Sequence, residues 1–181
     1  MAEKYGPIPY VHSRFQRKES DHYPTIDSRC VQALVDTWVI SGVVVDCCAP
    51  QGSGIVDALN RLGCVRAVCA DDVLHMDPAD WIITNPPYKR GLVDTIATDI
   101  VAKVRTGAVR GAALLMRANW DLAACRAALF ADPLYRGQTR LRFRPFWSEE
   151  RKAQPIHAFC WVVWAPGQGE PVIRYWPRIA A

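Results

Sequence analysis

The chain has 181 residues, of which 50% are hydrophobic and 22% are charged, and its formal net charge is +4. This composition is typical of one soluble globular domain with a hydrophobic core. No stretch approaches the roughly 18 consecutive apolar residues that a membrane-spanning helix needs, and the polar, basic N-terminus is unlike a secretory signal. The sequence therefore predicts a cytoplasmic protein without a membrane partner.

The first half of the chain predicts an arm followed by helices and strands. Residues 1–20 lack periodicity and are predicted to form the arm, and residues 21–181 a single domain. Ser28 can cap a first helix, whose apolar face extends to Val39. A strand that is apolar throughout is typical of a parallel sheet covered on both faces. The predicted helices are Arg29–Ser41 and Ile55–Leu62, and the predicted strands are Val43–Val45, Val65–Ala70 and Asp80–Thr84.

The second half continues the alternation and then changes. After Pro133 the pattern becomes one of consecutive strands, and the last two, on either side of the turn at Pro166–Gly169, are predicted to form an antiparallel hairpin at the sheet edge. The predicted fold class is therefore α/β, a Rossmann-like, doubly wound, mostly parallel sheet with an antiparallel C-terminal edge hairpin. The predicted helices are Leu92–Arg105 and Asp121–Phe130, and the predicted strands are Ala112–Met116, Tyr135–Phe143, His157–Trp164 and Pro171–Trp176.

A turn of small residues joins the strand at Val43–Val45 to the next helix and is a candidate cofactor loop. Small residues let the backbone approach a ligand, and the helix N-terminus offers free N–H groups. An acid at the strand end would repel a pyrophosphate but attract the ammonium group of S-adenosylmethionine, and Asp57 occupies the place of the third dinucleotide-fingerprint glycine. These features favour S-adenosylmethionine over NAD, the alternative being a tight turn without a ligand. The predicted contacts are Asp46, Ala49, Pro50, Gly52, Ser53 and Gly54.

Two adjacent acids, Asp71 and Asp72, end the next predicted strand. An acid at this place in a nucleotide-binding sheet can accept hydrogen bonds from both ribose hydroxyls. Asp71 is the first choice because it directly follows the apolar run, and Asp72 could instead cap a turn. Asp77 and Asp80 remain alternatives as adenine contacts or structural residues.

Asn85-Pro86-Pro87-Tyr88 follows a buried strand and is the predicted catalytic loop. The lone pair of an exocyclic amine is delocalised into its ring, so the amine is a poor nucleophile. The Asn85 amide oxygen and the Pro86 carbonyl can accept its two N–H protons and so free the lone pair, and Asn85 also lies where it can touch the cofactor. The prolines preorganise these acceptors, and Tyr88 can stack on a planar substrate. The alternative is a simple Pro-Pro turn.

The basic residues cluster at the N-terminus and between Tyr135 and Lys152, where arginines alternate with aromatic residues. Arginines mixed with aromatics suit a phosphate backbone with exposed bases, although a solvated loop is an equally good explanation. The charge therefore favours a nucleic-acid partner without establishing one. The predicted substrate contacts are Tyr88, Lys89, Arg140, Arg142 and Arg144.

The seven cysteines and four histidines have no metal-ligand spacing. No Cys-x-x-Cys pair occurs, and most of the cysteines lie in apolar stretches. The sequence therefore predicts buried free thiols and no metal.

Together these segments resemble the S-adenosylmethionine-dependent amino-methyltransferases of class I, whose [DNS]-P-P-[YFW] loop follows the fourth strand of a Rossmann-like sheet. The set is most similar to the compact, phage-type N6-adenine DNA methyltransferases. Besides the two loops, the segment Ala113–Trp120 and the residues from His157 to Trp176 resemble later strands of those enzymes. The segment at Tyr23, Pro24 and Thr25 resembles the family's N-terminal segment, and the resemblance implies that it touches the methionine part of the cofactor.

The chain departs from this family in two respects. Pro50 stands where the family has its first loop glycine, so the cofactor loop is expected to bend differently. The order of motifs resembles the gamma arrangement, but too few residues follow Tyr88 for a separate target-recognition domain. We therefore expect methylation of adenine N6 in DNA with a short or loose sequence preference. The alternatives are an RNA or protein-glutamine amino-methyltransferase, or a catalytically degenerate binding protein, and the sequence does not define the oligomeric state.

Overall fold

The structure, a computed structural model, describes residues 25–49, 52–63, 65–70, 78–89, 91–147 and 156–177. Two 3-10 turns, Trp120–Leu122 and Ala124–Arg126, precede the last helix. The helices are α1 (Arg29–Val35), α2 (Gly54–Leu62), α3 (Leu92–Arg105) and α4 (Ala127–Phe130). The strands are β1 (Val43–Asp46), β2 (Arg66–Cys69), β3 (Trp81–Thr84), β4 (Gly111–Arg117), β5 (Tyr135–Leu141), β6 (Phe159–Trp164) and β7 (Val172–Trp176).

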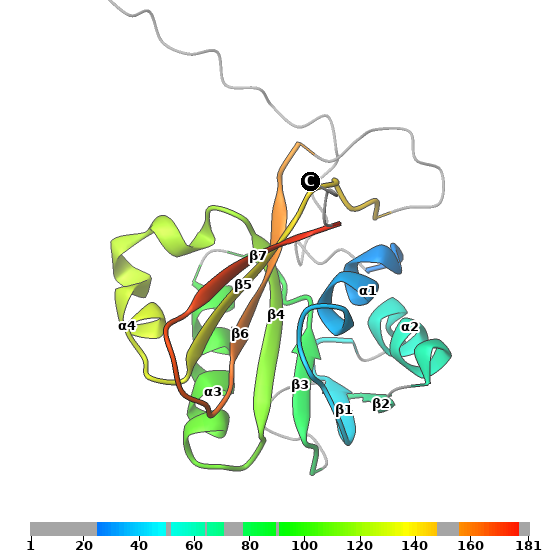
Figure 1. Cartoon of the computed structure of the whole chain (residues 1–181), viewed down its shortest axis with the longest axis horizontal. Helices are drawn as coiled ribbons and strands as arrows, with labels where there is room; N and C mark the ends of the chain where they lie inside the picture. The colour runs from blue at the N-terminus through cyan, green and yellow to red at the C-terminus, as the bar shows by residue number, and fades with distance from the viewer. Residues whose placement is uncertain are drawn as a thin grey trace, which may run out of the picture.

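Within the described residues the seven strands form one sheet in the order β2-β1-β3-β4-β6-β5-β7 (Figure 1). Strands β2, β1, β3 and β4 are parallel neighbours, and β6 runs antiparallel to both β4 and β5. The edge strand β7 is parallel to β5. This topology confirms the predicted α/β fold class with its mostly parallel, doubly wound sheet.

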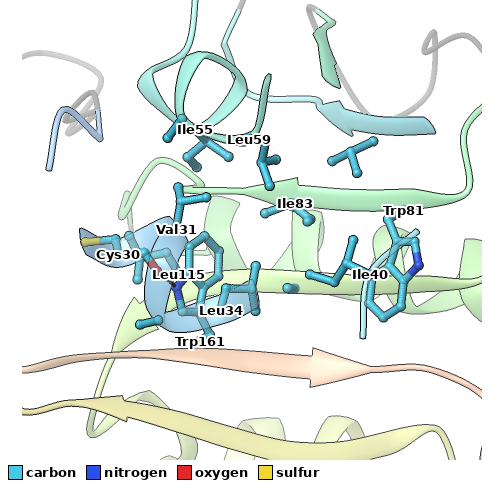
Figure 2. Packing of buried hydrophobic residues seen from close by; sticks show 14 of the residues in the cluster. Cys30, Val31, Leu34, Ile40, Ile55, Leu59, Trp81, Ile83, Leu115 and Trp161 are labelled. Atoms are coloured by element: carbon cyan, nitrogen blue, oxygen red, sulfur yellow. Dashed lines mark hydrogen bonds between the residues drawn. The ribbon is translucent and has the colours of Figure 1, made fainter. Parts of the chain in front are cut away.

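Each face of the sheet is covered by helices. Helices α1 and α2 bury their apolar sides against one face, where Trp161 of β6 donates a hydrogen bond from its indole N–H to the Cys30 carbonyl at 2.7 Å (Figure 2). Helix α3 covers the other face with side chains such as Ala97 and Ile100. Each large apolar side chain fully buried in this way stabilises the fold by about 1.5–3 kcal/mol. The two cores hold the central strands β3 and β4 from both sides.

Helix α1 ends six residues earlier than the sequence predicts. The Thr37 hydroxyl donates to the carbonyls of Ala33 and Leu34, at 2.6 and 3.2 Å, which satisfies the last turn. The Trp38 indole N–H then donates to Thr139 Oγ1 of β5 at 2.8 Å. Val39 is 92% exposed, so its predicted place on the buried helix face is wrong. Hydrogen bonds to the sheet override the helical periodicity here.

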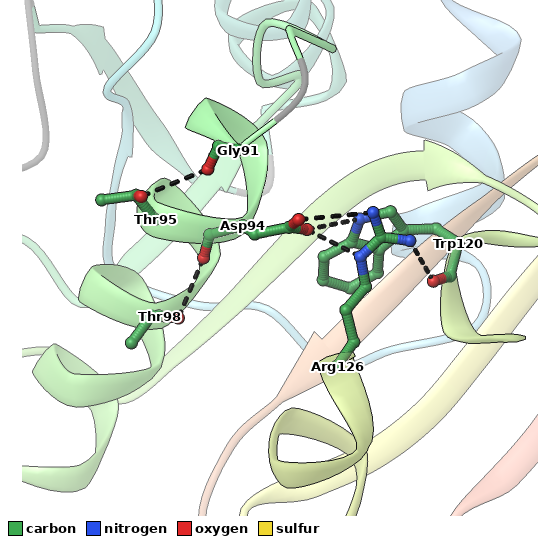
Figure 3. Close-up of polar contacts among 6 residues, drawn as sticks. All are labelled: Gly91, Asp94, Thr95, Thr98, Trp120 and Arg126. Carbon is green, nitrogen blue, oxygen red and sulfur yellow. Dashed lines mark hydrogen bonds and ion pairs between the residues drawn. The ribbon is translucent and has the colours of Figure 1, made fainter. Parts of the chain in front are cut away.

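The continuous helix predicted for Asp121–Phe130 is also wrong, because this segment forms two 3-10 turns and the short helix α4. Polar contacts with Asp94, in the first turn of α3, fix the segment (Figure 3). Its carboxylate accepts from Trp120 Nε1 at 3.2 Å and pairs with Arg126 Nε at 2.7 Å. Arg126 also donates to the Trp120 carbonyl at 2.7 Å, while Leu122 is 80% exposed. Tertiary contacts therefore replace the expected apolar helix face.

The predicted hairpin between the last two strands is not formed. Strand β6 has β4 on one side and β5 on the other, so β7 pairs with the free edge of β5 instead. The guanidinium of Arg136 donates to the carbonyls of Gly167, Gln168 and Gly169 and holds the loop that crosses to this edge. The turn at Pro166–Gly169 therefore belongs to a connection between β6 and β7, which are not neighbours in the sheet.

The predicted burial of the cysteines holds for Cys30, Cys47 and Cys160, whereas Cys69 and Cys125 are exposed. No helix among the described residues combines the length and apolarity that crossing a bilayer requires.

The contacts of Asp94 yield a stability prediction. We expect Asp94→Asn to lower the free energy of unfolding by about 1–3 kcal/mol, since the bonds to Trp120 and Arg126 lose their charged acceptor. Asp99→Asn, on the same helix, is the matched control and should change it by less than about 0.5 kcal/mol. Urea denaturation of the three proteins measures both values. Equal losses in the two variants would contradict the role assigned to Asp94.

Candidate functional site

The parallel strands place their carboxyl ends along one edge of the sheet. Because β1, β3 and β4 are adjacent and parallel, Asp46, Asn85 and Arg117 lie along this edge in that order. Ligands of open α/β sheets bind outside the carboxyl ends of the strands. The predicted cofactor loop and the predicted catalytic loop are thus brought side by side.

Asp46, at the end of β1, is the centre of a buried polar network. Its carboxylate is 3% exposed and accepts hydrogen bonds from the Ser53 hydroxyl at 2.6 Å and the Thr84 hydroxyl at 2.6 Å. The Cys48 backbone N–H adds a third, at 3.2 Å. A buried carboxylate is stable only when hydrogen bonds or charges compensate its lost hydration. Asp46 therefore fixes the cofactor loop to the end of β3, directly before Asn85.

Ser53 connects this network to helix α2. Its backbone is extended, and its Oγ accepts from the N–H groups of Ile55 and Val56 at 3.0 and 3.2 Å, as an N-cap residue does. Gly52, before it, has a φ of 113°, which favours glycine. The cap turns the N-terminus of α2 toward the same sheet edge as Asp46.

The backbone of Thr25 lies against Gly54 at the start of α2. A Cβ at Gly54 would lie 1.9 Å from the Thr25 carbonyl oxygen, so only glycine allows this contact. Thr25 is 4% exposed, and its buried hydroxyl has no hydrogen-bond partner among the residues that the structure describes. Such a group costs about 1–3 kcal/mol, which a bound ligand atom or a water would offset.

The catalytic loop begins with two buried residues, Asn85 and Pro86. Tyr88 packs between both cores, and its hydroxyl donates toward two acceptors, Asn85 Oδ1 at 2.6 Å and the Leu115 carbonyl at 2.7 Å. Burial raises the pKa of this hydroxyl well above 10, although the nearby Arg117 guanidinium opposes the shift. The loop thus holds the Asn85 carboxamide through a neutral phenol anchored on β4.

The aromatic ring of Tyr88 lies beside the Phe159 ring and the Arg117 guanidinium. The Phe159 ring lies 6.0 Å from it in an edge-on arrangement, and the Trp147 ring lies 5.0 Å from that of Phe159. The Arg117 guanidinium lies 5.5 Å from the centre of the Tyr88 ring. Stacking of Tyr88 on a substrate stays a prediction.

The three predicted substrate arginines differ in their surroundings. Arg140 donates to the Ala118 carbonyl at 2.6 Å and pairs with Asp121 at 3.3 Å, inside a polar cluster. Arg142 and Arg144 are exposed, and Arg142 lies 4.9 Å above the Tyr175 ring. Lys89 is exposed next to the catalytic loop. Contact of these residues with nucleic acid stays a prediction.

The remaining predicted positions divide into two groups. Ala49 is buried in the cofactor loop, and Asp80, one of the alternative acids, accepts from the Val43 N–H at 2.8 Å and pairs with Arg110 at 3.1 Å. Asp80 is thus structural and lies at the opposite sheet edge. The predicted contacts Tyr23, Pro24, Pro50, Asp71 and Asp72, the alternative Asp77, and the arm at 1–20 all lie outside the described residues.

Two residues of the site carry no signal in the sequence strong enough to have identified them. Thr84 is an ordinary strand residue whose only sequence hint is its place directly before Asn85. Arg117 ends an apolar strand, where the expected role of a charged residue is to meet solvent. Thr84 and Arg117 can be identified as site residues only once the strand order places them at the carboxyl edge of the sheet.

Solved structures allow the arrangement to be compared. No family model matches the sequence, and no curated protein has a matching sequence. An RNA methyltransferase candidate from Pyrococcus horikoshii superposes with a TM-score of 0.50 at 12% identity, over 76% of this chain and 82% of that chain. The chain therefore shares the Rossmann-like fold of that structure.

Two further solved structures are similar at lower TM-scores. The human methyltransferase 10 domain containing protein matches with a TM-score of 0.41 and 11% identity, over 76% of this chain and 77% of that chain. A class I S-adenosylmethionine-dependent methyltransferase candidate from Listeria monocytogenes has the same TM-score and identity, over 82% of this chain and 61% of that chain.

The buried Tyr88 hydroxyl predicts an alkaline effect on stability. A raised folded-state pKa means that its contribution is present below the unfolded-state pKa of about 10 and is lost as the pH rises above that value. Tyr88→Phe cannot ionise, and we expect it to be about 1 kcal/mol less stable at neutral pH. The stability difference should then narrow above about pH 10 in urea titrations. Parallel pH profiles of the two proteins would count against this assignment.

Proposed function

We propose that this protein transfers a methyl group from S-adenosylmethionine to the N6 amino group of adenine in DNA. The observation that carries the proposal is the placement of the Asn85 carboxamide. It lies in a rigid Asn-Pro-Pro-Tyr loop directly after β3, one strand from the Asp46 network. DNA is the first choice of acceptor because the loop and the N-terminal segment resemble those of N6-adenine DNA enzymes.

The residues at the sheet edge fit S-adenosylmethionine. The Asp46 carboxylate supplies negative charge near a cationic methionine group, and the capped N-terminus of α2 suits its carboxylate. The Thr25 backbone lies against Gly54, and the Thr25 hydroxyl has no partner among the described residues, so a ligand atom would complete its hydrogen bonding. When bound, the cofactor supplies an activated methyl group on a sulfonium. The residues proposed to hold it are Thr25, Asp46, Ser53, Gly54 and Asn85, with Tyr23, Pro24, Ala49, Pro50, Gly52, Asp71 and Asp72 as further contacts from the sequence.

Asn85 and Pro86 would activate the substrate nitrogen. Two carbonyl-type oxygens that accept the N–H groups of a planar amine favour a tetrahedral nitrogen with an available lone pair. Because the Tyr88 hydroxyl and the prolines hold these acceptors before the substrate arrives, little reorganisation is needed. Burial of Asn85 strengthens the effect by excluding water.

Methyl transfer to labelled acceptors tests the proposed function. The protein is incubated with methyl-labelled cofactor and, separately, unmethylated DNA, RNA and protein extract, and the modified base is identified by mass spectrometry. We expect N6-methyladenine in DNA. Label in RNA or on glutamine alone would overturn the DNA assignment and favour the corresponding alternative. Calorimetry without any cofactor binding would overturn the enzymatic proposal and leave a degenerate binding protein.

Variants of Asn85 test the mechanism. Asn85→Ala removes the side-chain acceptor and should lower kcat by about 10²–10³, the range for losing one preorganised hydrogen-bonding group. Asn85→Asp keeps a side-chain acceptor oxygen beside the Pro86 carbonyl and should retain more activity than the alanine variant. Calorimetry with the cofactor shows whether each variant still binds it. Unchanged turnover in a cofactor-binding Asn85→Ala protein would show that the mechanism is wrong.

A further inference from the structure

Arg117 lies beside the catalytic loop, and among the described residues its charge has an aromatic ring but no acidic partner. Its guanidinium lies 5.5 Å from the centre of the Tyr88 ring, and its buried Nε has no hydrogen-bond acceptor in the described part of the chain. Within the described residues no carboxylate forms an ion pair with it, whereas Arg126 and Arg140, also near this part of the fold, pair with Asp94 and Asp121. A guanidinium is usually paired when it is partly buried. The side chain therefore has donors to offer to a ligand.

Two other basic residues lie near Arg117. The ladder between β4 and β6 continues beyond Arg117, because the Ala118 N–H donates to the Ala158 carbonyl at 2.9 Å, and this places His157 alongside. Partial burial and the positive charges of Arg117 and Arg144 lower the pKa of His157. Arg144 follows the end of β5 at the same sheet edge and is exposed. Arg117, Arg144 and His157 are called the basic cluster below.

We propose that this basic cluster binds a phosphodiester group of the nucleic-acid substrate next to the target base. The inference rests on the proposed function and extends it to the backbone of the substrate. Arginine donors bind phosphate through two parallel hydrogen bonds, and histidine beside an anion is stabilised in its charged form. The ring of Tyr88 lies next to the Arg117 guanidinium and has an edge-on contact with the Phe159 ring, so the base attached to that phosphate would lie near these two rings.

The position of the cluster indicates that it binds a phosphodiester of the substrate and not the carboxylate of the cofactor. Strand β3 lies between β1 and β4, so Arg117 is two strand spacings, about 10 Å, across the sheet from Asp46, and the strand register places it further along its own strand as well. Asn85 stands between them, and its carboxamide is where transfer would occur. The cofactor is expected on the Asp46 side and the substrate on the Arg117 side.

Fluorescence anisotropy with adenine-containing DNA and RNA oligonucleotides, at several salt concentrations, tests the proposal. Arg117→Gln should weaken binding about tenfold at low salt and reduce the slope of log Kd against log salt by about one. Arg144→Gln should reduce the slope similarly. Because Arg144 is exposed, this variant is expected to fold and keeps the test valid even if Arg117→Gln misfolds. Arg66→Gln, exposed at the start of β2 on the opposite edge, is the control and should leave the slope unchanged.

The outcomes distinguish failure of the cluster proposal from failure of the proposed function. Slopes equal to that of the wild type in both cluster variants would overturn the proposal, even if the wild type methylates DNA. Weaker cofactor binding by Arg117→Gln with an unchanged slope would overturn it in favour of a carboxylate contact. A reduced slope in a protein that methylates nothing would support the cluster while the proposed function fails. Tighter binding of DNA or of RNA by the wild type shows which backbone the site prefers.

Discussion

The buried carboxylate of Asp46 is the interaction on which the site depends. Hydrogen bonds from Ser53, Thr84 and the Cys48 N–H join β1, β3 and the start of α2 around one charge. Since an uncompensated buried carboxylate is costly, none of these donors can move away without a penalty of several kcal/mol. The spacing between the cofactor loop and the catalytic loop is therefore set by a charge that folding has already removed from water.

The sequence could predict those parts of the fold whose contacts are local or repetitive. The α3 pattern repeats over four turns and is bounded as predicted, and α2 ends at Gly63, whose positive φ requires glycine. The end of α1 and the segment after β4 could not be predicted, because Thr139 and Asp94, which control them, are distant in the chain. The pairing of β7 could not be predicted either, since it depends on which strand edges are already occupied.

The site shows the same division between local and distant information. The Asn-Pro-Pro-Tyr motif and the acid at the end of β1 carry their chemistry in a few adjacent residues, so they could be selected from the sequence. Arg140 and Arg117 could not be distinguished in this way, because both are arginines near aromatic residues. Only the fold shows that Arg140 already has Asp121 as a partner, whereas Arg117 has an aromatic ring beside it and no acid among the described residues.

The Tyr88 hydroxyl has a single proton to donate. Two acceptors, Asn85 Oδ1 and the Leu115 carbonyl, lie within 2.7 Å of its oxygen. At any moment only one of them receives that proton, and the Leu115 carbonyl belongs to a strand that does not need to move. When another donor occupies the Asn85 oxygen, the hydroxyl can turn its proton fully to Leu115 and leave no buried donor unpaired. The Asn85 carboxamide can therefore exchange its hydrogen-bond donor at little free-energy cost, while the phenol stays anchored on β4.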